Sequence, residues 1–229
     1  MFLSGYGPVL LNGTWLTIQL ALLSLLLSVM IGLIGASSKL SNFKIARSVA
    51  TVYTTLIRSV PDLVIMLLIY YSLQLGLNSI TESLGMEQID INPFVAGVIT
   101  LAFIYGAYFT ETFRGAFQSV PKGQIEAAFA YGMTPLQVFR RVLFPQMMRF
   151  ALPGIGNNWQ VLIKATALVS IIGLTDIVKI TQDAGRSTMD VFYFSVIAAA
   201  IYLAITTVSN LILMWLERRY SAGVKKVQI

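Results

Sequence analysis

The chain has 229 residues, of which 56% are hydrophobic and 11% are charged, and it carries a formal net charge of +6. Soluble domains contain about a quarter charged residues, so this composition indicates a protein that faces lipid. Histidine and cysteine are both absent. Their absence excludes disulfides, histidine-ligated haem and the common zinc sites, and we predict neither a cofactor nor a metal site.

Five apolar segments are long enough to cross a membrane, which takes about 20 residues. They run over about 14–37, 49–75, 93–113, 151–174 and 191–216. Lipid cannot satisfy free backbone polar groups, so each span is expected to be a helix. We predict an all-α polytopic membrane protein in which residues 1–229 form one transmembrane domain.

Lysine and arginine are unevenly divided between the two sets of loops. If the N-terminus lies outside, only Lys179 and Arg186 fall in outer loops, while twelve of the 16 basic residues fall in cytoplasmic segments. These twelve are Lys39, Lys44, Arg47, Arg114, Lys122, Arg140, Arg141, Arg149, Arg218, Arg219, Lys225 and Lys226. Because basic loops stay in the cytoplasm, we predict a periplasmic N-terminus and a cytoplasmic C-terminus.

Small residues in the first span, Gly32, Gly35 and Ala36, predict close packing against another helix. The second span contains a carboxylate, Asp62, about a dozen residues in, which places it roughly 18 Å from the cytoplasmic end. Pro61 just before it removes a helical hydrogen bond, and broken membrane helices often line substrate sites.

A carboxylate at such a break suits a cationic substrate group. Two alternatives remain open, a salt bridge of Asp62 with Arg58 one helical turn away or with Lys164 of the fourth span. Near the end of the third span, Glu111 and Arg114 have the spacing of an i,i+3 ion pair.

Lys164 lies near the middle of the fourth span, where it either holds a substrate carboxylate or neutralises Asp62. The same helix carries uncharged polar side chains that either bind substrate or join helices. These candidates are Asn157, Gln160, Thr166 and Ser170.

A polar, basic loop of about 121–145 separates the third and fourth spans. Its apolar residues recur at helical spacing, and Thr134-Pro135 has the pattern of an N-cap followed by proline at the first helical position. We predict two short helices that meet near Gly132 and lie along the membrane surface. Their apolar face needs a partner, which is either protein or lipid.

The same loop carries Glu126-Ala127-Ala128, a glycine six positions after the glutamate, and Pro145 nineteen positions after it. This pattern resembles the coupling loop, or EAA loop, by which the permease subunit of a bacterial ABC importer docks on its ATPase. The stretches 57–63, 108–123 and 152–173 resemble polar amino acid importers, and most of all the Q-type permeases for histidine and for lysine, arginine and ornithine.

The resemblance implies the fold of a type I ABC importer permease in a bacterial inner membrane. Its partners would be a second permease, identical or homologous, two ATPase subunits and a periplasmic binding protein. The implied coupling residues are Glu126, Ala127, Ala128, Gly132, Pro135 and Pro145. In the family, a side chain at the glycine would prevent the two short helices from approaching closely.

The resemblance also bears on the charges within the spans. Permeases of this kind commonly carry a lysine at the position of Lys164 whatever the substrate, which favours a structural or gating role for it. Most carry an apolar residue after the proline of the second span, where this chain has Asp62. That departure favours a basic amino acid as substrate.

Two other classes of function compete with an importer. A proton-coupled secondary transporter would use Asp62 or Glu111 as its titrating group, but five spans without an inverted repeat count against it. A cofactor-binding subunit of a respiratory complex conflicts with the absence of histidine and cysteine. No phosphate-binding loop motif occurs, so we expect a subunit that does not itself hydrolyse ATP.

Overall fold

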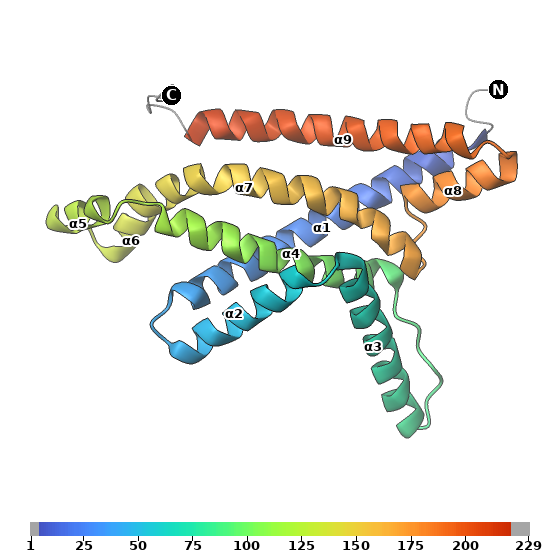
Figure 1. Ribbon diagram of the computed structural model, residues 1–229, viewed down its shortest axis with the longest axis horizontal. Coiled ribbons are helices and arrows are strands. Elements are labelled where there is room, and N and C mark those ends of the chain that lie inside the picture. The colour runs from blue at the N-terminus through green and yellow to red at the C-terminus, as the bar shows by residue number, and fades with distance from the viewer. Residues whose placement is uncertain (1–4, 221–229) are drawn as a thin grey trace.

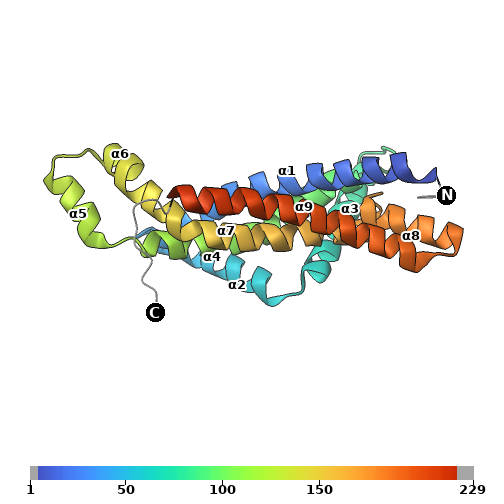
Figure 2. The same ribbon diagram turned by 90° about the horizontal axis from the view of Figure 1, so that it is seen from above.

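The long helices of the chain lie side by side in an elongated bundle (Figures 1 and 2). The computed structural model describes residues 5–220, so Lys225 and Lys226 lie outside the described residues. The bundle contains α1 (Gly7–Leu40), α4 (Pro93–Gln118), α7 (Phe144–Ala165) and α9 (Val191–Tyr220). Helix α4 is the most buried and packs against both α1 and α7. The all-α polytopic fold is thus confirmed.

The contact between α1 and α4 depends on small residues. A Cβ placed on Gly32 would lie 2.5 Å from the Cβ of Phe109, and one on Gly35 would collide with Thr110. Ala36 is fully buried in the same helix. The close packing predicted for these three residues is confirmed, and it lets the backbones of α1 and α4 approach each other.

The second predicted span consists of two helices, α2 (Lys44–Ser59) and α3 (Asp62–Ser83). Val60 between them is extended, with ψ of 140°, because a residue before proline is driven out of the helical region. Pro61 also has no N–H to continue the α2 hydrogen-bond ladder. Helix α3 leaves the bundle at an angle to α2 (Figure 1).

The fourth predicted span also changes conformation along its length. Helix α7 continues into the 3-10 helix η3 (Thr166–Ile172), which ends where Gly173 takes a left-handed backbone with φ of 101°. The next segment was expected to be a loop, but it forms helix α8 (Ile177–Thr188). The helical stretch Pro135–Ile172 and helix α8 are bent by 58° relative to each other. Asp176 caps α8 by accepting a 2.9 Å hydrogen bond from the backbone N–H of Lys179.

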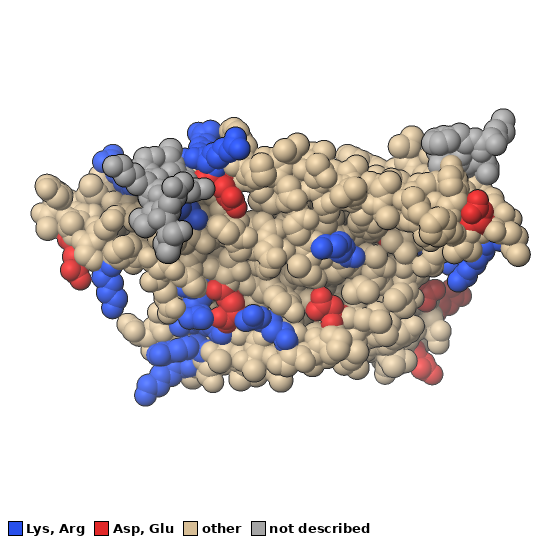
Figure 3. Space-filling view, turned by 45° about the horizontal axis from the view of Figure 1, so that its top comes forward, with Lys and Arg blue, Asp and Glu red and all other residues tan. Residues whose placement is uncertain are grey.

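The two ends of the bundle differ in charge. Lysine and arginine gather at the end that carries α5 and α6, and few of them lie toward the α8 end (Figure 3). Four described helices are long and apolar enough to cross a membrane, and five spans result if the bent pair that ends in α8 counts as one. The middle of the molecule is therefore the part that suits the hydrocarbon core.

Candidate coupling and substrate sites

The predicted coupling loop forms a helical hairpin that projects beyond the bundle (Figure 2). It consists of α5 (Lys122–Ala130), α6 (Pro135–Val138) and the π-helical turn η2 (Phe139–Leu143), which leads into α7. The Thr134 side chain accepts a 3.4 Å hydrogen bond from the backbone N–H of Gln137, whose side chain accepts one of 2.9 Å from Thr134. The N-cap at Thr134 and the helical start at Pro135 are confirmed.

Gly132 follows the end of α5, and its backbone conformation, not lack of space for a side chain, favours glycine there. A Cβ at this position would meet no atom within 4 Å, so the expectation that a side chain would block the approach of the two helices is wrong within this chain. Its φ is +77°, a left-handed conformation that costs an L-residue about 1–2 kcal/mol. Its N–H bonds the carbonyl of Phe129 at 2.9 Å, and this turn reverses the chain between α5 and α6.

The hairpin presents both charge and apolar surface. Glu126 and Ala127 are exposed, whereas Ala128 is buried against the rest of the hairpin. Glu126 lies beyond the first turn of α5, so it does not complement the positive end of that helix. Tyr131 and Leu136 are 86% and 65% exposed. An amphipathic hairpin with exposed aromatic and aliphatic side chains suits a protein groove.

Pro145 stands apart from the tip of the hairpin. It is half-buried near the start of α7, as the second residue of that helix. Close by, the side chain of Gln146 donates a 2.5 Å hydrogen bond to that of Gln124 in α5. This bond ties the base of the hairpin to α7.

Asp62 is the first residue of α3 and is held by a residue that the sequence did not single out. Its Oδ2 accepts a 2.9 Å hydrogen bond from the hydroxyl of Tyr105 in α4. A carboxylate at a helix N-terminus is also stabilised by the helix dipole. Tyr105 is one of two tyrosines in the third span, and its phenol in an apolar stretch was the only sequence signal for it.

Arg58 lies on the other side of the break, in the last turn of α2. Its guanidinium sits 5.4 Å from the centre of the Tyr108 ring, which stacks on Tyr105 with ring centres 5.6 Å apart. Among the described residues, no ion pair joins Asp62 to Arg58 or to Lys164. Both salt-bridge alternatives for Asp62 are therefore wrong for this chain alone, and two tyrosines of α4 support the polar groups at the break.

The polar residues of the fourth span divide into exposed and internally bonded groups. Lys164 and Asn157 are exposed on α7. Gln160 instead donates a 2.7 Å hydrogen bond to the side chain of Asn210 in α9, so it joins the two helices. An interhelical role was one of the alternatives that the sequence left open for it.

The two remaining candidates lie in η3. Thr166 is fully buried, donates a 2.7 Å hydrogen bond to the carbonyl of Ile163 and lies 3.4 Å from the hydroxyl of Tyr202 in α9. Ser170 is half-buried and donates to the carbonyl of Ala167 at 2.7 Å. Neither hydrogen-bonds to Asp62, and no described group of His, Cys, Asp or Glu within residues 5–220 has the arrangement of a metal site.

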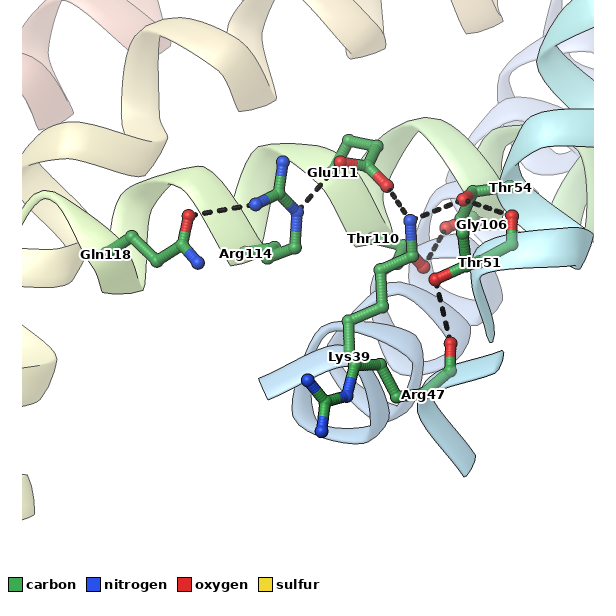
Figure 4. Close-up of polar contacts among 9 residues, drawn as sticks. All are labelled: Lys39, Arg47, Thr51, Thr54, Gly106, Thr110, Glu111, Arg114 and Gln118. Carbon is green, nitrogen blue, oxygen red and sulfur yellow. Dashed lines mark hydrogen bonds and ion pairs between the residues drawn. The ribbon is translucent and has the colours of Figure 1, made fainter. Parts of the chain in front are cut away.

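A charged network joins α1, α2 and α4 near the hairpin end of the bundle (Figure 4). The predicted pair of Glu111 and Arg114 is confirmed at 2.9 Å. Lys39 of α1, which the sequence did not place here, also pairs with Glu111 and donates a 2.6 Å hydrogen bond to Thr54 of α2. Glu111 therefore holds cations from two helices.

A polytopic helical bundle with a polar break in one span and an amphipathic hairpin at one end is the architecture of a transporter's membrane subunit. Residues 14–222 match the family described as "Binding-protein-dependent transport system inner membrane component", and the chain belongs to that family. It is a multi-pass permease of the inner membrane and not an enzyme. Neither a secondary transporter nor a respiratory cofactor subunit fits this family.

Characterised relatives support the same class. The chain is 62% identical to the histidine/lysine/arginine/ornithine transport system permease protein HisQ of Salmonella typhimurium, over 99% of this chain and 100% of the relative. It is 61% identical to HisQ of Escherichia coli K12 over the same shares. It is 34% identical to the arginine ABC transporter permease protein ArtQ of E. coli K12, over 92% of this chain and 94% of the relative.

Solved structures confirm the fold. The crystal structure of an amino acid ABC transporter with histidines contains a chain that superposes with a TM-score of 0.78 at 35% identity, covering 93% of this chain and 95% of that one. An inward-facing structure of the MetNI methionine ABC transporter gives 0.69 at 19% identity, covering 92% and 97%, which shows a common fold.

Proposed function

We propose that the chain is the permease subunit of an ATP-driven importer for basic amino acids, namely histidine, lysine, arginine and ornithine. The substrates named for the 62% identical HisQ relatives support this assignment. The observation that carries it is Asp62, a carboxylate at the break between α2 and α3 that has no cationic partner within the described chain. A cationic substrate group would provide that partner.

The proposed substrate site centres on Asp62, with Tyr105 fixing its carboxylate. Exposed Lys164 and Asn157 would contact the substrate carboxylate or the second permease, and Arg58 would border the path from α2. Hydrogen bonds within the chain occupy the side chains of Gln160, Thr166 and Ser170. These three residues would therefore line the wall of the path without binding the substrate directly.

A second permease, identical or homologous, would complete the path, because one chain leaves broad apolar faces uncovered. In helix α9 the only buried residue is Phe194, whereas Leu203, Leu211 and Trp215 are more than half exposed. The α5–α6 hairpin would seat in an ATPase subunit, one beneath each permease. A periplasmic binding protein would deliver substrate at the α8 end.

This arrangement corresponds to a periplasmic N-terminus and a cytoplasmic C-terminus, as the distribution of basic residues predicts. ATP binding would close the ATPases, draw the two hairpins together and open the path outward. The binding protein would then release its amino acid, whose cationic group Asp62 receives. ATP hydrolysis would restore the inward-open state.

Uptake by the whole complex tests the proposed substrate. The permeases, ATPases and binding protein are reconstituted in vesicles, and ATP-dependent uptake of labelled arginine, lysine, ornithine, histidine and glutamine is measured. We expect the basic amino acids to be transported and glutamine to be excluded, since its uncharged side chain does not compensate the charge of the Asp62 carboxylate. Equal transport of glutamine would contradict the assignment.

A further inference from the structure

A hollow near the hairpin end of the bundle contains more positive than negative charge. It lies between α1, α2 and α4, has a volume of about 330 Å³, and is lined by Lys39, Arg47, Thr51, Arg114 and Gln118. Among the described residues, Glu111 is the carboxylate that pairs with its cations, and it binds both Lys39 and Arg114. Three cations beside one carboxylate leave an excess of positive charge that an anion would balance.

Hydrogen-bond donors remain free in this hollow. Arg114 directs its Nε to Glu111 and its Nη1 at 2.8 Å to Gln118. The guanidinium of Arg47 has no hydrogen bond or ion pair to any residue described in the structure, and Figure 4 shows it beside the stem of Lys39. Arginine offers five N–H donors in a planar fork that matches a phosphate group.

The position of the hollow points to lipid as the source of the phosphate. It lies where the first and third predicted spans end, just beyond their last apolar residues. The neighbouring turns of α1 and α2 expose Ile34, Ile45 and Val49, which are each more than 60% accessible. A phosphate bound in the hollow would therefore have apolar side chains nearby on which acyl chains can pack, whereas a soluble anion makes no use of them.

We propose that Arg47, Lys39 and Arg114 bind the phosphate of an acidic phospholipid. The assignment to the inner leaflet rests on the orientation given above, but the site itself is independent of which amino acid is transported. Arg47 supplies the fork that approaches the phosphate, while Lys39 and Arg114 add charge from positions fixed by Glu111. The lipid thereby links α2 to α1 and α4 at the end of the bundle that carries the coupling hairpin.

Lipid retention by the assembled complex tests this site. The complex is reconstituted with phosphatidylethanolamine alone or mixed with phosphatidylglycerol, stripped with detergent, and the phosphatidylglycerol retained per complex is counted by native mass spectrometry. We compare Arg47→Gln with Lys44→Gln, which removes an exposed cation from the same helix outside the hollow. Arg47→Gln should weaken retention about fivefold, and Lys44→Gln should leave it unchanged.

Three outcomes would overturn the proposal. Equal loss in both variants would show only general attraction of basic residues to acidic lipid. Retention unaffected by Arg47→Gln would remove the site. Displacement of the bound lipid by millimolar inorganic phosphate, with no preference for phosphatidylglycerol, would identify a soluble anion as the occupant. If the complex with Arg47→Gln fails to assemble, Arg47→Lys is tested in its place. This variant keeps the charge but loses the planar guanidinium, so its lipid retention should still be lower than that of Lys44→Gln.

Discussion

Asp62 has structural contacts within the chain and is also the centre of the proposed substrate site. As the first residue of α3 it is stabilised by the N-terminus of that helix and by the hydroxyl of Tyr105. These contacts hold the carboxylate in place without a cation of the described chain beside it. In the proposed function, a positive charge from outside the chain fills this place.

Replacement of Asp62 by asparagine tests this role. Asp62→Asn keeps the shape and can still accept the Tyr105 hydrogen bond, but it removes the charge. A hydrogen bond to a charged group contributes about 1.5–3 kcal/mol, so we expect arginine uptake to fall about tenfold or more while assembly is retained. Uptake is measured with the reconstituted complex, and Asp90→Asn in the loop before α4 is the matched control. A complex that no longer assembles would assign Asp62 a structural role.

Gly132 is constrained by backbone conformation and not by space. Because its φ is +77° with no atom near an added Cβ, Gly132→Ala strains the turn by about 1–2 kcal/mol without a clash inside the chain. We expect weaker ATPase binding and lower transport. Gly123→Ala, at a position in the same hairpin with open space and no left-handed backbone, should leave both unchanged. Pull-down of the ATPase compares the two variants, and equal binding would contradict the argument.

At the scale of elements, the packing of α1 on α4 depends on the absence of side-chain atoms. Gly32→Ala forces its Cβ against Phe109, whereas Gly76→Ala in α3 meets open space. Overpacking costs about 1–3 kcal/mol. We expect Gly32→Ala to lower the Tm of the detergent-solubilised complex by about 2–4 °C per kcal/mol, and Gly76→Ala to leave it unchanged. A Tm that is unaffected by Gly32→Ala would contradict the argument, since it would mean that α1 can shift away from α4 without loss of stability.

The charged network makes a second prediction at this scale. The side chain of Lys39 is only 10% exposed, so Glu111→Gln removes the partner of a nearly buried ammonium and should destabilise the protein by about 1–3 kcal/mol. The double variant Lys39→Met/Glu111→Gln should recover part of the loss, because no buried charge is left unpaired. Thermal unfolding of both variants provides the measurement. A double variant less stable than the single one would show that the pair is not the source of the effect.

At the scale of the whole molecule, one chain leaves its apolar faces and its hairpin without partners. Tagged and extracted in mild detergent, the chain should co-purify with a second permease and with an ATPase. Gly132→Glu should abolish the ATPase association while leaving the permease pair intact, since it adds charge and strain at the turn of the hairpin. Purification of the chain alone would count against the proposed assembly.

The sequence by itself determined the class of the protein. Long apolar segments predict membrane helices. The coupling-loop pattern around Glu126 and Gly132 lies within about twenty consecutive residues. Pro61 interrupts a helix because it has no backbone N–H to donate. All three depend on residues that are close together in the chain. The i,i+3 pair of Glu111 and Arg114 was predictable for the same reason.

Only the tertiary structure decided which distant side chains meet. It placed Tyr105 on Asp62 and Lys39 on Glu111, residues 43 and 72 positions apart in the chain, and it turned Gln160 toward α9. The sequence had offered Arg58 and Lys164 as partners for Asp62, because opposite charge, helical spacing and depth in the span were the visible criteria. Long-range contacts follow from how the helices pack, and the close approach of α1 to α4 that brings Lys39 to Glu111 is a property of the assembled bundle.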